Sequence, residues 1–202
     1  MTEAGRPKAV SPVVASMLPP GHLAVAYLCY WAIAQRRFGG RVAPGAAVVV
    51  VVASQFPDLI DKPLSWWFGV LPTGRTLAHT LLVLVPLAAI VYWALDTRGR
   101  TQIGLAFGVG ALSHAFADAA MSVVYREVPT FLLWPVLAVE TDGYGTPSIL
   151  GLLVEAYTKS GLVSSAILLE GGLLVLAAWL WVRDGTPGLP KVSLAPTKVR
   201  DR

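Results

Sequence analysis

Histidine and aspartate side chains recur near the predicted ends of apolar segments in this chain. The sequence has three histidines, and each is expected to lie beside a carboxylate. Charged residues make up only 14% of the chain, and ionisable groups at membrane depth are costly. A shared metal ion is the most economical reason to keep them there. The candidate ligands are His22, Asp58, Asp61, His79, His114 and Asp118.

The spacing of these residues allows metal binding but also has structural explanations. His114 and Asp118 are four apart, which in a helix places them on one face, about one turn apart. A histidine within the membrane can instead hydrogen-bond a neighbouring helix. Asp58 and Asp61, three apart after Pro57, could equally be a helix stop followed by an N-cap. Convergence of all the residues favours a metal site.

The same residue types predict hydrolytic chemistry. Imidazole and carboxylate together suit Zn²⁺, whereas a mostly carboxylate shell suits Mn²⁺ or Mg²⁺. A bound metal activates water as a nucleophile, and Asp58 or Asp61 could orient a ligand imidazole or act as the general base. Arg75 could bind an anionic phosphoester through its planar fork. Arg75 could instead be an anchor at the membrane interface or form an ion pair with an aspartate.

Composition favours an integral membrane protein. The 202 residues are 55% hydrophobic, and the mean hydropathy is +0.62. The net charge of +4 is small. The basic residues of the chain lie in loops and at the C-terminus, a pattern that suits orientation in a membrane and not nucleic-acid binding. The expected partners are therefore the lipid bilayer and a small-molecule or lipid phosphoester. The single cysteine, Cys29, excludes a disulfide within the chain.

Five apolar segments predict an all-α polytopic bundle, because about 20 apolar residues cross a bilayer core. The segments are 21–36, 43–57, 76–95, 102–124 and 161–182, with a loop over 58–74 and an amphipathic helix over 148–160. A flexible arm over 1–18 is expected before the transmembrane domain of 19–182, and a disordered basic tail over 183–202 after it.

Small and ionisable residues have distinct expected places in this bundle. Gly104, Gly108 and Gly110 in the fourth segment should permit close helix packing. Glu170 in the last segment is expected to have a structural role, with pairing to a site residue as the alternative.

Basic residues indicate the orientation of the bundle in the plasma membrane. The first and third loops and the C-terminal tail carry the excess of arginine and lysine, so they should be cytoplasmic. The C-terminus is then cytoplasmic. Four separate elements deliver their histidines and aspartates to one depth, at the extracytoplasmic side.

The order of the motifs resembles that of a known family. A histidine near the first span is followed by Pro-Asp-x-x-Asp, Arg-x-x-x-His-Thr and His-x-x-x-Asp. Over roughly residues 20–137 the chain resembles the YdjM-like membrane-bound metal-dependent hydrolases, which are distantly similar to zinc-dependent phospholipase C and P1-type nucleases. The resemblance implies that Arg75 lies beside a metal site formed by His22, Asp58, Asp61, His79, His114 and Asp118.

Three functions compete on this basis. The leading hypothesis is a membrane-embedded metal-dependent hydrolase of a phosphoester or lipid-derived substrate. A transporter or permease subunit would use the same cluster to hold a transported metal ion, but its polar residues should continue across the bundle. A non-catalytic scaffold would use the cluster as a buried hydrogen-bond network.

Overall fold

The computed structural model describes residues 17–139 and 165–190. All regular secondary structure within these ranges is helical, which confirms the predicted all-α class. The elements are α1 (Pro19–Arg37), α2 (Pro44–Ala53), α3 (Phe56–Trp66), α4 (Leu81–Asp96), α5 (Thr101–Val124), the short 3-10 helix η1 (Thr130–Leu133) and α7 (Ser165–Arg183). The predictions for the arm up to residue 16, the amphipathic helix over 148–160 and the tail from residue 191 lie outside the described residues.

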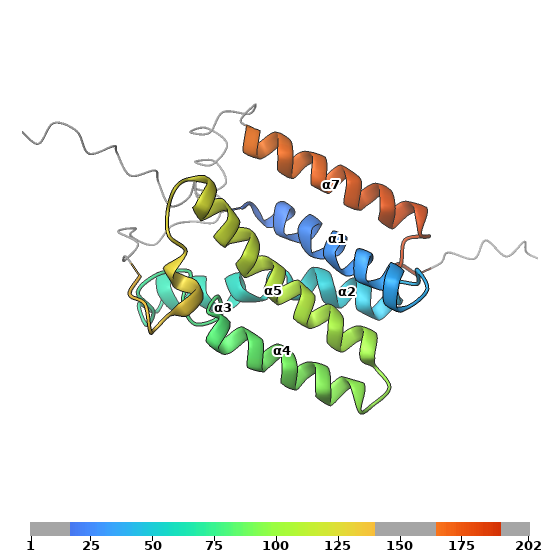
Figure 1. The fold of residues 1–202 in the computed structure, drawn as a ribbon, viewed down its shortest axis with the longest axis horizontal. Coiled ribbons are helices and arrows are strands. Elements are labelled where there is room, and N and C mark those ends of the chain that lie inside the picture. The colour runs from blue at the N-terminus through green and yellow to red at the C-terminus, as the bar shows by residue number, and fades with distance from the viewer. Residues whose placement is uncertain (1–16, 140–164, 191–202) are drawn as a thin grey trace, which may run out of the picture.

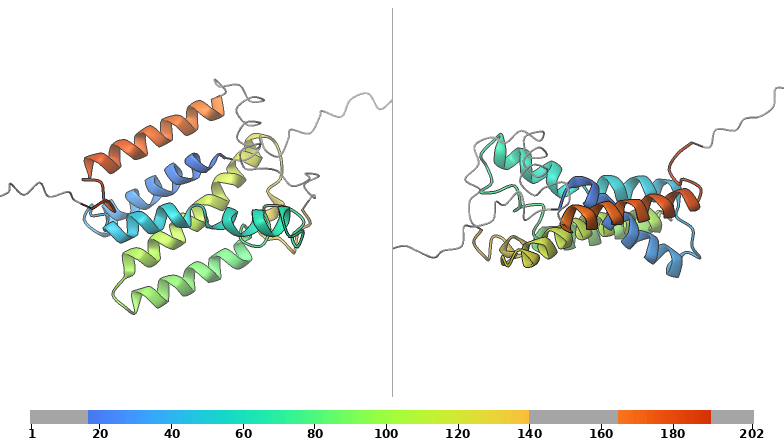
Figure 2. Two further views of the ribbon diagram at one scale, coloured as in Figure 1. Left: turned by 180° about the vertical axis from the view of Figure 1, so that it is seen from behind. Right: turned by 90° about the horizontal axis from the view of Figure 1, so that it is seen from above.

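Helix α5 is the centre of the bundle (Figure 1). It packs against α4, α2 and α1, and α1 packs against α7 on the side away from α4. Seen from behind, α2 and α3 follow one another across α5 (Figure 2). This arrangement brings the N-terminal end of α1, all of α3 and the C-terminal half of α5 to the same end of the molecule.

Glycines allow α5 to approach its neighbours closely. A Cβ atom at Gly110 would lie 2.8 Å from both the Ala53 Cβ and the Val50 carbonyl oxygen, and one at Gly104 would lie 2.9 Å from the Tyr92 Cα. Real Cβ atoms essentially never approach other atoms this closely. Neither α2 nor α4 could therefore pack as it does on a larger residue, and the predicted role of these glycines is confirmed.

Two helical stretches are long and apolar enough to cross a membrane, judged by length and composition. One is Pro44–Trp66, which contains both α2 and α3, and the other is Thr101–Val124, which is α5. Helix α4 is apolar but shorter. The membrane class is thus supported by two helices of the described residues, and a count of five spans stays a prediction.

The predicted loop over 58–74 is wrong in its first half, because α3 covers Phe56–Trp66. Pro57 does not end a helix. It lies in the first turn of α3, where its missing N–H is not needed and its fixed φ suits a helix. Asp58, in the same turn, has a favourable interaction with the positive end of the helix dipole. The actual break lies at Ser54 and Gln55, between α2 and α3.

The helix predicted from residue 76 begins later, at Leu81. Thr80 is its N-cap, and the Thr80 hydroxyl accepts a hydrogen bond of 3.3 Å from the Leu82 N–H. His79 therefore lies in the turn before α4. The start of the predicted tail also has contacts with the bundle, since the Trp181 Nε1 donates to the Pro187 carbonyl oxygen over 3.0 Å.

Candidate metal centre

The predicted site residues meet at one end of the bundle. His22 comes from α1, Asp58 and Asp61 from α3, Arg75 and His79 from the segment before α4, and His114 and Asp118 from α5. All three histidines, Asp61 and Asp118 are buried. The structure thus places four separate elements around one cluster, as the topology predicted.

The orientation of His114 is set by the break between α2 and α3. The His114 Nδ1 lies 2.6 Å from the carbonyl oxygen of Ser54. A carbonyl oxygen can only accept a hydrogen bond, so Nδ1 must carry the proton. The neutral ring then presents a bare Nε2 lone pair on its other side.

The orientation of His79 is set by Asp61. The His79 Nδ1 lies 2.8 Å from the Asp61 Oδ2. The same carboxylate accepts hydrogen bonds from the backbone N–H groups of Thr76 (2.7 Å) and Ala78 (2.8 Å). Both Asp61 oxygens accept from N–H groups, so His79 also holds its proton on Nδ1 and leaves Nε2 bare when neutral.

The two bare nitrogens face each other. The His79 Nε2 and the His114 Nε2 are 3.2 Å apart, and the Asp58 Oδ1 lies 3.6 Å from each of them. Two lone pairs cannot hydrogen-bond one another, so a proton or a cation between them is required. Zinc bonds of 2.0–2.1 Å in tetrahedral geometry place ligand atoms about 3.3–3.4 Å apart. This triangle of donors therefore fits a divalent metal ion.

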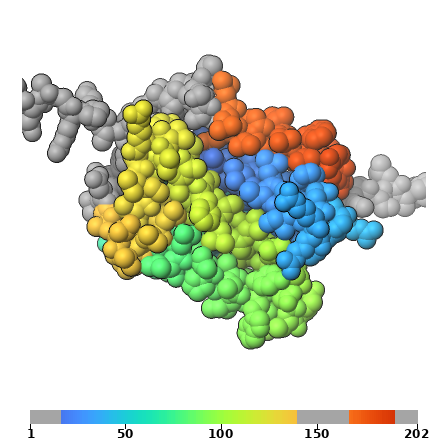
Figure 3. Space-filling model, viewed as in Figure 1, coloured from blue at the N-terminus to red at the C-terminus, as the bar shows by residue number. Residues whose placement is uncertain are grey.

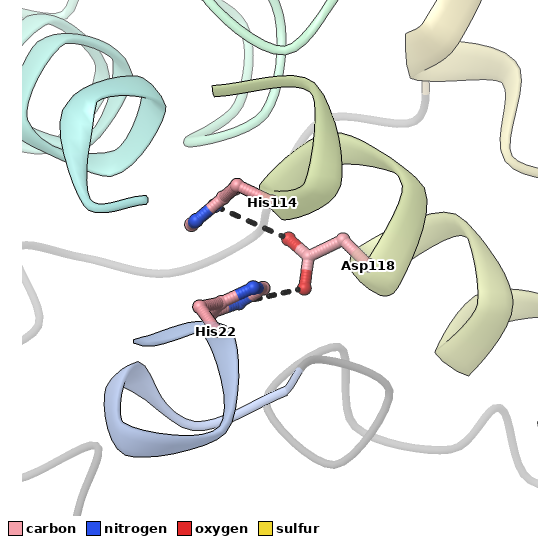
Figure 4. A group of neighbouring side chains, drawn as sticks. All are labelled: His22, His114 and Asp118. Atoms are coloured by element: carbon pink, nitrogen blue, oxygen red, sulfur yellow. Dashed lines mark ion pairs between the residues drawn. The ribbon is translucent and has the colours of Figure 1, made fainter. Parts of the chain in front are cut away.

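Asp118 lies beside this triangle. Its Oδ2 is 3.8 Å from the His79 Nε2 and 4.0 Å from the His114 Nε2. Its Oδ1 is 3.2 Å from the His22 Nε2 and accepts a hydrogen bond of 3.3 Å from the Met17 N–H. Figure 4 shows the carboxylate turned toward the imidazoles of His22 and His114. Asp118 thus connects α1 to the nitrogens of the other two histidines.

Comparison with known protein families gives one match. The family model described as "YdjM inner membrane protein" matches residues 17–184. The chain belongs to the YdjM inner membrane protein family. No curated protein and no solved structure matches the chain. The match covers the predicted resemblance over 20–137 and extends it through α7, so the whole described bundle is the family domain.

Membership in the YdjM family places the cluster in a membrane protein, where buried charge needs partners. Among the described residues, two groups of side chains could hold a metal ion. One is His22, His114 and Asp118, and the other is Asp58, His79 and His114. His22 stacks on His114 with ring centroids 3.7 Å apart and an interplanar angle of 16°. The buried His22 Nδ1 has no hydrogen-bond partner among the described residues.

Cations lie on two sides of the cluster. The Lys62 ammonium forms an ion pair with the Asp58 Oδ2, one turn away on α3. The Arg75 Nε lies 3.4 Å from the Asp118 Oδ2, and its guanidinium is 5.9 Å from the centre of the Phe131 ring. Arg75 therefore pairs with an aspartate, as one of its sequence-based alternatives stated, and the aspartate belongs to α5.

Several supporting groups had no recognisable signal in the sequence. The Ser54 carbonyl and the N–H groups of Thr76 and Ala78 are backbone atoms, which any residue would supply. Thr80 fixes η1 over the cluster, because its hydroxyl is 3.1 Å from the Leu132 carbonyl oxygen and 2.8 Å from that of Trp134. A threonine following a histidine was part of the recognised motif, but its contact with η1 spans more than fifty residues.

Glu170 contacts the backbone at the start of α1. Its carboxylate accepts from the Leu18 N–H, at 3.2 Å for Oε2 and 3.4 Å for Oε1. This contact ties α7 to the residue that precedes α1. A Cβ atom at Gly21 would lie 2.8 Å from the Glu170 Oε2, so only glycine leaves room for this carboxylate.

Proposed function

We propose that this protein is a membrane-embedded metal-dependent hydrolase that cleaves a phosphoester at the extracytoplasmic face. The observation that carries the proposal is the pair of Nε2 atoms 3.2 Å apart, each with its Nδ1 already committed to another partner. Ligand histidines usually donate their second N–H to a carboxylate or a carbonyl. His79 and His114 do so, to Asp61 and Ser54.

The ligand set we favour is His79, His114 and Asp58, with zinc as the best-suited ion. Three protein ligands leave a position open for water, as catalytic zinc sites require. A bound ion would supply a nucleophilic water near neutral pH and polarise a phosphoryl oxygen. Asp61 is better explained as the group that orients His79, because its oxygens already accept two backbone hydrogen bonds and the His79 N–H.

Asp118 and Arg75 are the remaining polar groups of the reaction. Asp118 Oδ2 is next to the donor triangle, where it can accept a proton from the attacking water. The Arg75 side chain is 19% exposed and has charge to offer an anionic substrate. Hydrolysis would join the water oxygen to phosphorus, break the phosphorus–oxygen bond to the leaving group, and return the proton to the leaving oxygen.

A permease is less well supported than a hydrolase. The buried charged side chains of the described residues all gather at the end of the bundle that holds the cluster, and the groove along α5 is apolar. Transport of an ion would require polar groups along its path.

Hydrolysis of simple phosphoesters tests the proposal. Purified protein loaded with zinc or manganese should cleave p-nitrophenyl phosphate or methyl p-nitrophenyl phosphate, and His114→Ala should lose this activity. The Asp184→Asn variant serves as a matched control, because Asp184 bonds Trp31 at the opposite end of α1. Equal activity in His114→Ala, or no cleavage of any phosphoester by metal-loaded wild type, would contradict the proposal.

A further inference from the structure

The two oxygens of Asp58 have different partners. Oδ2 forms an ion pair with the Lys62 ammonium, and the two residues are four apart on α3, which places their side chains on one face of the helix. Oδ1 lies 3.6 Å from the Nε2 atoms of His79 and His114. The carboxylate therefore presents one oxygen to the donor triangle and the other to a cation.

The side chain of Lys62 is packed in place by its own neighbours. Its ammonium lies 5.6 Å from the centre of the Trp66 ring. A Cβ atom at Gly74 would lie 3.3 Å from the Lys62 Cγ and 3.2 Å from the Trp66 Nε1, which is closer than most real Cβ contacts. Gly74 thus leaves room for the lysine stem beside the indole. Because only 30% of the side chain is exposed, Lys62 is a packed part of the site and not a mobile surface charge.

Lys62 and Arg75 approach the cluster from different elements. Helix α3 lies on the face of the bundle that is seen from behind in Figure 2, whereas η1 lies on the face shown in Figure 3. The Arg75 guanidinium is 5.9 Å from the ring of Phe131 in η1 and pairs with Asp118. Of the two cations, Lys62 is therefore the one that contacts the carboxylate of the donor triangle.

We propose that Lys62 is a positioning residue that restricts Asp58 to binding the metal ion through one oxygen. An oxygen that accepts a charge-assisted hydrogen bond from an ammonium has less negative charge to share with an ion, and turning it toward the ion would break that bond. With Oδ2 held in this way, Asp58 leaves the fourth tetrahedral position to water. The inference rests on the proposed function, because only a hydrolase needs this position for a nucleophile.

Lys62→Met tests the proposal, since methionine is similar in length and can fill the space beside Gly74 without a charge. In the zinc-loaded variant both Asp58 oxygens should bind the ion. X-ray absorption at the zinc edge detects this change, because the carboxyl carbon then lies closer to the metal. Zinc affinity, measured by competition with a chelator, should rise about tenfold, because a neighbouring positive charge is gone. The kcat for a phosphoester should fall about 10- to 100-fold.

Arg183→Met is the matched control. It also removes the cation of an ion pair, since the Arg183 Nε lies 3.0 Å from the Asp184 Oδ1, but this pair is at the opposite end of the bundle. Its zinc affinity, metal–carbon distance and kcat should equal those of wild type. Both variants should insert into the membrane, because loss of a charge lowers the cost of insertion.

Two results would overturn the proposal. An unchanged metal–carbon distance in Lys62→Met would show that another group sets the coordination of Asp58. Weaker zinc binding in this variant would show that Lys62 only supports the structure of the site. A wild-type protein that binds zinc but cleaves no phosphoester would refute the hydrolase, while the absorption spectra would still decide the role of Lys62.

Discussion

The proton positions on His79 and His114 are the residue-scale feature on which the candidate site depends. Each ring has one nitrogen hydrogen-bonded to an acceptor outside the donor triangle, Asp61 for His79 and Ser54 for His114, and the other nitrogens are 3.2 Å apart. A scaffold network would have a proton on one of these two nitrogens, whereas a metal site would have an ion between them. The Asp58 Oδ1, 3.6 Å from each nitrogen, supplies a third donor and favours the ion.

Asp61→Asn tests whether Asp61 orients His79. The amide has the shape of the carboxylate but one acceptor oxygen fewer, so it cannot satisfy Thr76, Ala78 and His79 together. Loss of such a supporting group lowers metal affinity about 10- to 100-fold. Competition with a zinc chelator would measure the change. Unaltered affinity would show that Asp61 has no part in the site, and complete loss of binding would favour a direct ligand.

Arg75→Lys separates charge from geometry. Lysine keeps the positive charge beside Asp118 but lacks the planar fork that binds two phosphoryl oxygens. The variant should retain its metal and lose about 2–4 kcal/mol of transition-state stabilisation, which is roughly 30- to 1000-fold in kcat/KM. Steady-state kinetics on the best phosphoester, with metal content measured on the same sample, gives both values. Full turnover in Arg75→Lys would leave this arginine a structural role.

Asp118→Asn tests whether Asp118 accepts a proton from water or binds the metal ion directly. If Asp118 accepts the proton of water, the variant should bind metal normally and lose turnover about 100-fold or more. Metal analysis and kinetics on one preparation distinguish the two roles. Loss of the metal would return Asp118 to the ligand set that the sequence predicted.

At the scale of elements, the sequence analysis did not predict the break between α2 and α3. Five consecutive valines and Pro57 indicated one span and a stop. The chain instead breaks at Ser54 and Gln55 and resumes as α3, which turns the Ser54 carbonyl toward His114. The spacing of Asp58 and Asp61 could be read from the sequence. The different contacts of their side chains depend on α3, which was predicted as a loop. Backbone groups that orient ligands have no side-chain signature.

Gly110→Ala tests the packing that positions this break. The new Cβ would lie 2.8 Å from Ala53 and 3.1 Å from the Ser54 backbone nitrogen, so α2 must move away from α5. Overpacking of this kind costs about 1–3 kcal/mol of stability and should also displace the acceptor of His114. The melting temperature in detergent and the metal affinity should both fall. Gly171→Ala is the control, because no atom from another part of the described structure lies within 4 Å of its new Cβ. Equal melting temperatures for the two variants would contradict the packing argument.

At the scale of the whole molecule, the sequence predicted the class, the family and the convergence of the ionisable residues. Apolar composition and the scarcity of charge sufficed for the membrane class, and the order of short motifs sufficed for the YdjM family. The apolar groove along α5 was not predicted, because it depends on the distance between α1 and α4. Periodicity shows which residues share a helix face but not whether a neighbouring helix covers that face.

Metal content of the purified protein tests the central claim most directly. Wild type and Asp184→Asn are loaded with zinc, freed of excess ion and analysed by mass spectrometry, alongside His79→Ala and His114→Ala. We predict one divalent ion for each chain in the first two and none in the histidine variants, which should still insert into the membrane because loss of a polar group lowers the cost of insertion. A wild-type protein that retains no divalent metal, or histidine variants that retain as much as wild type, would contradict the account.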